Sequence, residues 1–293
     1  MRSPRCISLL TAASLLVALA AVSVAQQTPP VPSKTLPAGQ PPGGAIMKVL
    51  ASTKTGFSYT IRVEPEAFDS DEGERVLEPE SDSSTSTPGA AASPAAAAIP
   101  KTEFFKGTAR KAAKLSVATT KTIQPFNDLN ALIATLPSKK SMVNHNPPIT
   151  TSANSNRVSE ENRNVRVLCW LYAASRENDN DYHLILGRVP GATPLRFMTM
   201  ELSGLPPVTA ASFPALKAAR GAFNDFFGPN LPGTSYDFYP TPIPVQIEGS
   251  LFFDMTHATG TPPGPSSLRP NMPTIWEVHP ITSIIFEPLG PPN

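Results

Sequence analysis

Hydrophobic and polar positions in the second half of the chain predict five β-strands. Each run either alternates apolar with polar residues, as half-buried strands do, or is a short apolar run rich in β-branched and aromatic residues. Turn-forming Asn, Asp, Pro and Gly residues separate the runs. In the third run, Phe197, Thr199 and Glu201 alternate with three apolar neighbours. The predicted strands cover residues 165–174, 182–188, 196–202, 245–255 and 275–286.

A helical pattern at residues 212–227 lies between the third and the fourth predicted strands. Ser212 is a candidate N-cap, Pro214 falls in the first turn, and Gly228 follows the last apolar residue. The apolar side chains recur on one helical face. These side chains are Phe213, Leu216, Phe223 and Phe227.

Three strands, one helix and two strands is the element order of an OB-fold, a five-stranded Greek-key barrel. We therefore predict a mainly β, OB-like domain over residues 157–287, with a split β-sandwich as the alternative. The loop at 256–274 is long for a hairpin and would extend from one end of the barrel, where such folds usually bind ligands. Residues 288–293 are predicted to be a disordered tail.

The first half of the chain lacks a comparable pattern. Residues 26–100 are rich in Pro, Ser, Thr and Ala, and nine acidic residues accompany a single basic one at 64–82. Such segments bury too little apolar surface to offset chain entropy, so a largely disordered tether is predicted. Residues 57–63 alternate like a short strand, but an isolated hairpin around 46–63 would be marginally stable.

Residues 101–156 are predicted to be a basic, partly helical linker. Its first 40 residues hold eight Lys or Arg and two acidic residues. Short helices are predicted at 106–116 and 127–136, the second with four apolar side chains on one face. The basic residues either neutralise the acidic segment before them or bind an anionic polymer, lipid or nucleic acid. The four apolar side chains are Leu129, Leu132, Ile133 and Leu136.

The N-terminus has the layout of a secretory signal peptide at residues 1–25. Arg2 and Arg5 precede an uncharged apolar stretch, and small residues at positions 23 and 25 predict cleavage after Ala25. A membrane anchor is the alternative, because the apolar stretch approaches spanning length. We expect a secreted or periplasmic protein with no membrane span after cleavage.

Composition and charge narrow the classes of function. Of the 293 residues 35 are proline, too many for one compact domain to place without breaking its helices and strand pairs. Cys6 lies in the signal peptide, so Cys169 is alone, excluding an intramolecular disulfide; its apolar run predicts a buried residue rather than a nucleophile. From Arg157 onward, nine basic residues stand against twelve acidic ones, which argues against nucleic acid as a partner.

Each of the three histidines in the predicted domain has an acidic residue close in sequence. In two of the pairs the residues are two apart, so both side chains lie on one face of a strand. If the strands lie close together, the six side chains converge into a ligand site or an acid–base pair, with His183, His257 and His279 as metal ligands. Otherwise each carboxylate holds a neighbouring imidazole or turn as a buried polar anchor. The pairs are Asp181 with His183, Asp254 with His257, and Glu277 with His279.

The motifs around these histidines resemble those of a family of uncharacterised secreted bacterial proteins. The resemblance covers residues 157–287 and consists of a D-Y-H strand, an F-F-D strand followed by a histidine, and a terminal E-x-H-P strand. The family has glycine after the second histidine and a short loop, whereas this chain has Ala258 and a longer proline-rich loop. The resemblance implies an OB-like domain whose three histidines form one cluster, and it implies no established activity.

Two hypotheses of function follow. The first is an exported, non-enzymatic protein whose OB-like domain binds a cell-wall polymer or oligosaccharide through the loops at one end. The second is a metal-assisted hydrolase, such as a phosphodiesterase or nuclease, in which the histidines and Glu277 or Asp254 hold an ion and position water. A divalent metal is the one cofactor that the residues suggest. The sequence has no G-x-S-x-G elbow, Walker loop or dinucleotide-binding glycine motif.

Overall fold

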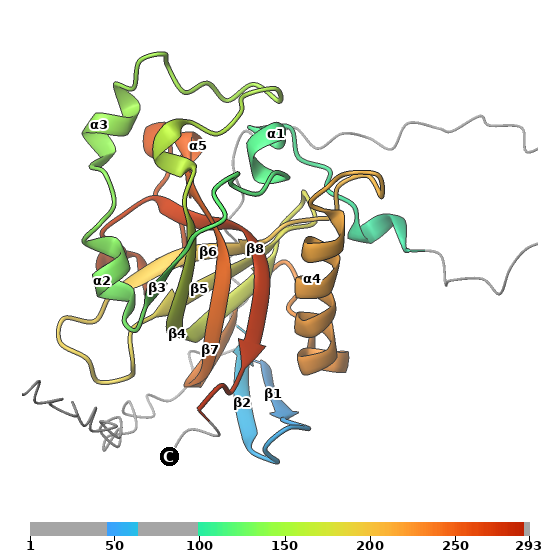
Figure 1. The fold of residues 1–293 in the computed structure, drawn as a ribbon. Coiled ribbons are helices and arrows are strands. Elements are labelled where there is room, and N and C mark those ends of the chain that lie inside the picture. The colour runs from blue at the N-terminus through green and yellow to red at the C-terminus, as the bar shows by residue number, and fades with distance from the viewer. Residues whose placement is uncertain (1–45, 64–98, 290–293) are drawn as a thin grey trace, which may run out of the picture. The chain divides into compact units, whose positions relative to one another are not determined.

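The computed structural model describes residues 46–63 and 99–289, and eight strands within them form one mixed sheet (Figure 1). The strand order is β1-β2-β7-β8-β6-β5-β4-β3, and β7 also pairs with β4. The predicted signal peptide with its cleavage site after Ala25, most of the predicted tether and the last four residues lie outside the described residues. The strands are β1 (Ile46–Ala51), β2 (Ser58–Val63), β3 (Ile123–Phe126), β4 (Asn164–Arg176), β5 (Tyr182–Gly187), β6 (Phe197–Leu202), β7 (Asp237–Phe253) and β8 (Trp276–Phe286).

Five α-helices and four 3-10 turns accompany the sheet in the described ranges. Within these ranges, the apolar stretches in helices are all too short to cross a bilayer. The helices are α1 (Lys111–Lys114), α2 (Leu129–Ile133), α3 (Lys139–Val143), α4 (Phe213–Phe227) and α5 (Met255–Thr259). The 3-10 turns are η1 (Lys101–Glu103), η2 (Ser159–Glu161), η3 (Gly228–Asn230) and η4 (Arg269–Asn271).

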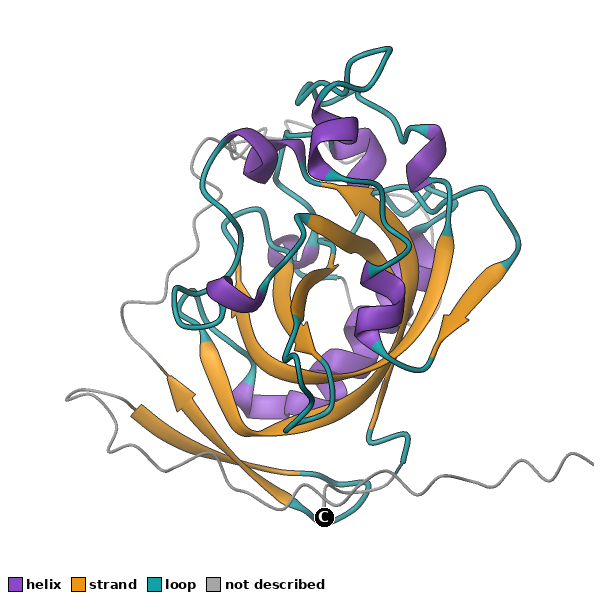
Figure 2. Ribbon diagram, turned by 90° about the vertical axis from the view of Figure 1, so that its left-hand side faces the viewer, coloured by secondary structure: helices purple, strands orange, loops and turns teal. Residues whose placement is uncertain are grey.

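The pairing of β4 with β7 closes a ring through the five strands β4, β5, β6, β8 and β7. Neighbours in this ring are antiparallel except β6 and β8, which are parallel. Figure 2 shows these strands curving around a common centre. All five are strands that the sequence pattern predicts, and the prediction of a mainly β fold is confirmed. The sheet is larger than predicted, because β1, β2 and β3 extend it beyond the ring.

Proline does not end β7, which begins at Asp237 although the sequence predicts a start at residue 245. Pairing with β4 shifts here, since Ala173 pairs with Phe238 but Leu171 pairs with Ile243. The extra residues on β7 form a bulge whose exposed tip includes Pro240. A bulge accommodates residues that have no N–H to give to the neighbouring strand.

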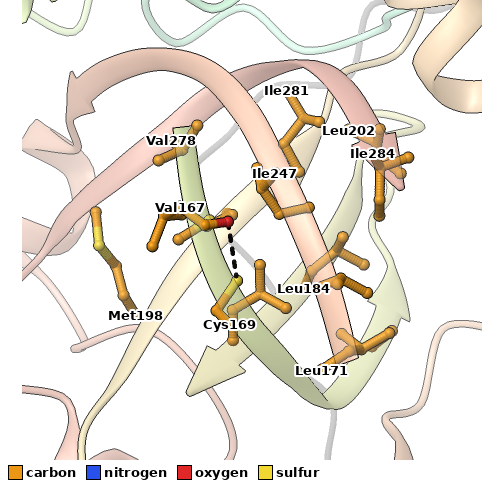
Figure 3. Packing of buried hydrophobic residues seen from close by; sticks show 14 of the residues in the cluster. Val167, Cys169, Leu171, Leu184, Met198, Leu202, Ile247, Val278, Ile281 and Ile284 are labelled. Carbon is orange, nitrogen blue, oxygen red and sulfur yellow. Dashed lines mark hydrogen bonds between the residues drawn. The ribbon is translucent and has the colours of Figure 1, made fainter. Parts of the chain in front are cut away.

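Apolar side chains from all five strands pack together between the strands of the ring (Figure 3). Cys169 is fully buried among them, with its Sγ 4.0 Å from the carbonyl oxygen of Val167. The prediction of a buried, unreactive cysteine agrees with this position, and burial raises the pKa of the thiol well above its ordinary value. Because strand side chains alternate, every second residue of these strands faces away from this core.

Helix α4 follows β6 and packs on β8, where the rings of Phe226 and Phe286 stack 3.9 Å apart (Figure 1). Its position between the third and fourth strands of the ring confirms the predicted helix. The side chain of Ser212, the predicted N-cap, does not cap the helix. Its Oγ instead donates a hydrogen bond to the carbonyl of Leu115.

The hairpin β1–β2 corrects the prediction of disorder for residues 46–63. It joins the sheet through β2, whose Arg62 and Val63 pair with the start of β7. Glu287, directly after β8, accepts hydrogen bonds from Ser52 Oγ, Thr55 Oγ1 and Tyr59 Oη at 2.6, 2.9 and 2.8 Å. The alternation predicts the strand correctly, but the partners that make the hairpin stable come from the far end of the chain.

Residues 101–156, predicted as a basic linker, pack against the sheet. Strand β3 pairs in parallel with β4, and Leu129 and Leu132 of α2 are fully buried in the core. Arg110 lies buried with its guanidinium 2.6 and 2.8 Å from the two carboxylate oxygens of Glu161. Part of the basic charge therefore serves the fold itself. The helical face of α2 is a local pattern and was predictable, whereas its burial depends on a distant sheet.

Candidate metal centre

Polar side chains gather on the face of the sheet that points away from the apolar core of the ring. On β5, β6 and β8 these polar residues alternate with core residues such as Leu184, Met200 and Val278. His183 lies opposite Glu201, and Met200 lies opposite Val278, so polar positions of three neighbouring strands come side by side. The polar positions on this face include His183, Glu201, Glu277 and His279.

Seven ionisable side chains meet here, and we call them the His–carboxylate cluster. They comprise the six residues singled out from the sequence and one more, Glu201. Each side chain is at most 5% exposed. The predicted convergence of the three histidines is thus present in the fold. The members are Asp181, His183, Glu201, Asp254, His257, Glu277 and His279.

Glu201 lies between two imidazoles. Its Oε1 is 3.4 Å from His183 Nε2, and its Oε2 is 2.8 Å from His279 Nδ1. The other ring nitrogen of His279, Nε2, lies 3.4 Å from Asp181 Oδ2. That oxygen is buried and accepts no hydrogen bond from residues 46–63 or 99–289, while Asp181 Oδ1 accepts one from the N–H of Gly204.

Asp254 and His257 reach the cluster from the start of α5. Asp254 caps this helix, because its Oδ1 accepts hydrogen bonds from the N–H groups of Thr256 and His257 at 2.7 and 3.2 Å. His257 Nδ1 is 2.7 Å from the carbonyl oxygen of Thr261, so in the neutral ring Nδ1 carries the proton. The lone pair is then on Nε2, which faces Asp254 Oδ2 at 3.7 Å.

The cluster contains three overlapping groups of three residues. Within each group, the three ligand atoms lie within 4.8 Å of one another. Each group has one imidazole and two carboxylates, which are ligands of divalent first-row metal ions. Each histidine belongs to a different group, so His183, His257 and His279 are each combined with two carboxylates rather than with one another. The groups are the Asp181 triad (Asp181, Glu201, His279), the His183 triad (His183, Glu201, Glu277) and the Asp254 triad (Asp254, His257, Glu277).

Burial and mutual contacts shift the pKa values in the cluster. Burial, with help from the neighbouring carboxylates of Asp179 and Glu201, raises the pKa of Asp181 well above its ordinary value. Burial lowers the pKa of His279 more than the adjacent Glu201 raises it. For Glu201, burial alone raises the pKa, but His279 and other nearby nitrogens outweigh it, so the net shift is downward. A neutral imidazole beside an ionised carboxylate is the protonation state in which both groups bind metals.

Segments outside the ring cover the cluster. Lys114 of α1 lies 3.6 Å from Asp179, which precedes β5. Gly204, after β6, lies so close to the segment before α1 that a Cβ there would be 2.6 Å from the Cα of Phe105. Tyr236 Oη lies within hydrogen-bond distance, 3.1 Å, of His183 Nδ1. These contacts explain how strongly polar strand faces become buried.

The proline-rich loop after α5 forms another part of this cover. At Gly264 a Cβ would lie 2.6 Å from the sulfur of Met272 and 3.3 Å from Cδ1 of Ile185, the residue after next from His183 on β5. The loop is therefore packed onto the sheet near Gly264 and not only extended from its end, as the sequence suggests. Glycine is needed here both for space and for its φ of +82°.

Glu201 is the cluster residue that sequence reasoning missed. It has no histidine close in sequence, and only the alternation with Met198, Met200 and Leu202 marks it as facing away from the core. A lone charged residue within an apolar strand was the available signal. Lys114 and Tyr236 lie far from the histidines in sequence, and no sequence pattern connects them with the cluster.

No protein-family model matches this chain, and neither a curated protein nor a solved structure is detectably similar to it. The resemblance to the secreted bacterial family therefore stays a prediction. The function has to be inferred from the chemistry of the His–carboxylate cluster.

Proposed function

We propose that this protein is an exported metal-binding protein whose OB-like domain holds a divalent first-row metal ion in the His–carboxylate cluster. One observation carries the proposal: four carboxylates and three imidazoles, from β5, β6, β8, α5 and the residues just before β5 and α5, are buried close together. Ionisable groups are seldom fully buried unless they are paired or bind a metal. The four carboxylates are those of Asp181, Glu201, Asp254 and Glu277.

The charge of the cluster supports a cation. Ionised carboxylates a few ångströms apart repel each other strongly where water is excluded. Lys114 Nζ lies 3.6 Å from Asp179 Oδ2, and its positive charge lowers the pKa values of Asp181 and Glu201, so it offsets only part of this repulsion. A divalent ion would neutralise two carboxylates and at the same time bind imidazole nitrogens, so it would satisfy both kinds of side chain.

The ligand types favour Mn²⁺, Fe²⁺ or Zn²⁺. Carboxylates suit harder ions and imidazoles suit zinc and iron, whereas thiolates select softer ions. Cys169, the single cysteine among the described residues, packs in the core of the ring instead. His183, Glu201 and His279 would be the first ligands to examine, because Glu201 contacts both rings.

The order of the ring supports the OB-like assignment. The first three strands, β4, β5 and β6, are neighbours in sequence order; β7 pairs with the first, and β8 lies between β6 and β7. With α4 between the third and the fourth strands, this is the order expected of an OB-fold. Export is proposed from the signal-peptide layout of residues 1–25 alone.

Metal binding is better supported than metal-assisted hydrolysis of a polymer. The cluster side chains are at most 5% exposed, so a polymeric substrate has no direct contact with them. Binding of a cell-wall polymer or oligosaccharide by the loops stays a prediction. The polar groups that the structure brings together lie in the buried cluster, and they support binding of an ion rather than of a polymer.

Elemental analysis tests the proposal on a purified chain that starts at Gln26 and so retains every described residue. We expect a bound first-row metal in the wild type, a lower melting temperature after chelation, and a lower metal content in His279→Ala than in the wild type. His145→Ala is the matched control, because His145 lies outside the cluster and contacts Glu160 and the carbonyl of Pro147. Absence of bound metal after incubation with Mn²⁺, Fe²⁺ and Zn²⁺, with melting unaffected by chelation, would contradict the proposal.

A further inference from the structure

We infer that the cluster is a two-cation centre, with one divalent ion in the Asp181 triad and a second in the Asp254 triad. The inference rests on the proposed metal-binding function and extends it. The two triads share no residue, and each presents one imidazole and two carboxylates with all ligand atoms within 4.8 Å. Each triad is therefore a complete set of three protein ligands by itself.

The charges of the cluster match two cations better than one. When ionised, the two carboxylates of a triad carry two negative charges and its neutral imidazole carries none. One divalent ion therefore matches the two carboxylates of one triad, whereas two ions match all four. Because burying unbalanced charge is costly, the second cation would stabilise the folded chain.

The His183 triad connects the two proposed sites. It takes Glu201 from the Asp181 triad and Glu277 from the Asp254 triad, and His183 Nε2 lies 3.4 Å from Glu201 Oε1. The Asp181 triad and the Asp254 triad also contact each other directly, because His279 Nδ1 of the first is 3.6 Å from Glu277 Oε2 of the second. Carboxylates placed between two ions are typical of two-metal centres. Glu201 and Glu277 are thus the residues that would lie between the cations.

Separate features prepare each site for a ligand. In the Asp181 triad, Asp181 Oδ2 is buried, lies 3.4 Å from His279 Nε2, and accepts no hydrogen bond from the described part of the chain. In the Asp254 triad, the carbonyl of Thr261 holds the Nδ1 proton of His257, so that the lone pair of Nε2 points toward Asp254. The first site combines β6 and β8 with the residue just before β5, and the second combines β8 with α5 and its N-cap.

Calorimetric titration of the metal-free chain with Zn²⁺, checked by elemental analysis after gel filtration, tests the inference. We expect two Zn²⁺ per chain. A single Zn²⁺ per chain in the wild type would overturn the two-cation inference and leave the proposed metal-binding function standing. No Zn²⁺, Mn²⁺ or Fe²⁺ at all would contradict both, so the two failures are distinguishable.

Variants assign the two ions to the two triads. His257→Ala and His279→Ala are each expected to bind one Zn²⁺, and the control His145→Ala two. Near-ultraviolet circular dichroism checks that each variant is folded, and two Zn²⁺ in a folded His257→Ala protein would overturn the assignment. The wild type loaded with Mn²⁺ gives a test that needs no variant. Two adjacent Mn²⁺ ions give an exchange-coupled paramagnetic resonance spectrum, and a six-line spectrum of isolated Mn²⁺ at full loading would contradict the two-cation centre.

Discussion

Glu201 Oε2 lies 2.8 Å from His279 Nδ1, and this contact joins β6 to β8 across the one parallel junction of the ring. The backbone pairing there is short, with Met200 opposite Val278. On the core side these two apolar residues pack within the ring, and on the other side Glu201 and His279 meet. The same junction therefore joins two strands of the ring and assembles the centre of the cluster.

Replacing Glu201 with glutamine should weaken metal binding at both of the nearest histidines. The amide keeps the shape of the side chain but removes the charge, and neutral amide oxygens are poorer ligands than carboxylates. We expect the Kd for Zn²⁺ to rise at least about tenfold, a loss in the range seen when groups around a metal are altered. Competition with a chromophoric chelator measures this Kd. Asp237→Asn is the control, and an unchanged Kd in Glu201→Gln would show that Glu201 is not a ligand.

Asp237 should make stability depend on pH. Burial raises the pKa of its carboxyl from 3.8 to about 6, and Lys48 Nζ, 3.8 Å away, offsets this only in part. Because the folded pKa lies above the unfolded one, the folded state holds the extra proton between about pH 4 and 6. The free energy of unfolding therefore falls as the pH rises from about 4 to 6, and the decrease is complete above this range.

Asp237→Asn should accordingly stabilise the protein at pH 7.5 by about 1–2 kcal/mol, after allowance for solvent screening, and have little effect at pH 4. Urea unfolding of the variant and the wild type at the two pH values gives the difference. Equal differences at both pH values would show that the carboxyl does not titrate in this window.

The buried pair of Arg110 and Glu161 should be essential for stability. Arg110 also donates a hydrogen bond to the carbonyl of Phe253 at 2.9 Å, so it ties the segment before α1 to the end of β7. Arg110→Ala leaves the Glu161 carboxylate buried without its guanidinium, which typically costs about 3–5 kcal/mol. Urea unfolding measures the loss, with exposed Lys139→Ala as a control expected to change stability by less than about 0.5 kcal/mol. A small effect of Arg110→Ala would contradict a stabilising role for this buried pair.

Glu287 should hold the β1–β2 hairpin on the sheet. Its carboxylate accepts three hydrogen bonds from the hairpin, and Lys54 Nζ donates to the carbonyls of Phe286 and Glu287 at 2.8 Å. Glu287→Ala removes three of these bonds. If the free energy of opening the hairpin falls by more than roughly 1.4 kcal/mol, amide hydrogen exchange in residues 46–63 should become about tenfold faster or more. Mass spectrometry of peptic fragments measures the exchange rate. Glu248→Ala, which removes a carboxylate paired with Arg166 on the sheet surface, should leave the exchange of this hairpin unchanged.

The elements of the ring were predictable because their signals are local. Period-two alternation marks β6, apolar runs with β-branched or aromatic residues mark β4, β5 and β8, and the helical period marks α4 and the buried face of α2. Proline misled the prediction at the start of β7, where a bulge absorbs it. Strand β3 was not predicted, since its four residues include Pro125 and it exists through parallel pairing with β4.

Local alternation was enough to predict that Asp181 shares a face with His183, and Glu277 with His279, because alternation along one strand does not depend on the neighbouring strands. That these faces meet depends on how distant segments pair in the folded chain. The register of β5 on β6 places Glu201 opposite His183, and the parallel junction of β6 with β8 brings His279 to the same carboxylate. Register and pairing depend on contacts between segments far apart in sequence, which no local pattern encodes. The same holds for the cover of Lys114, Tyr236 and the loop at Gly264, which turns a polar strand face into a buried centre.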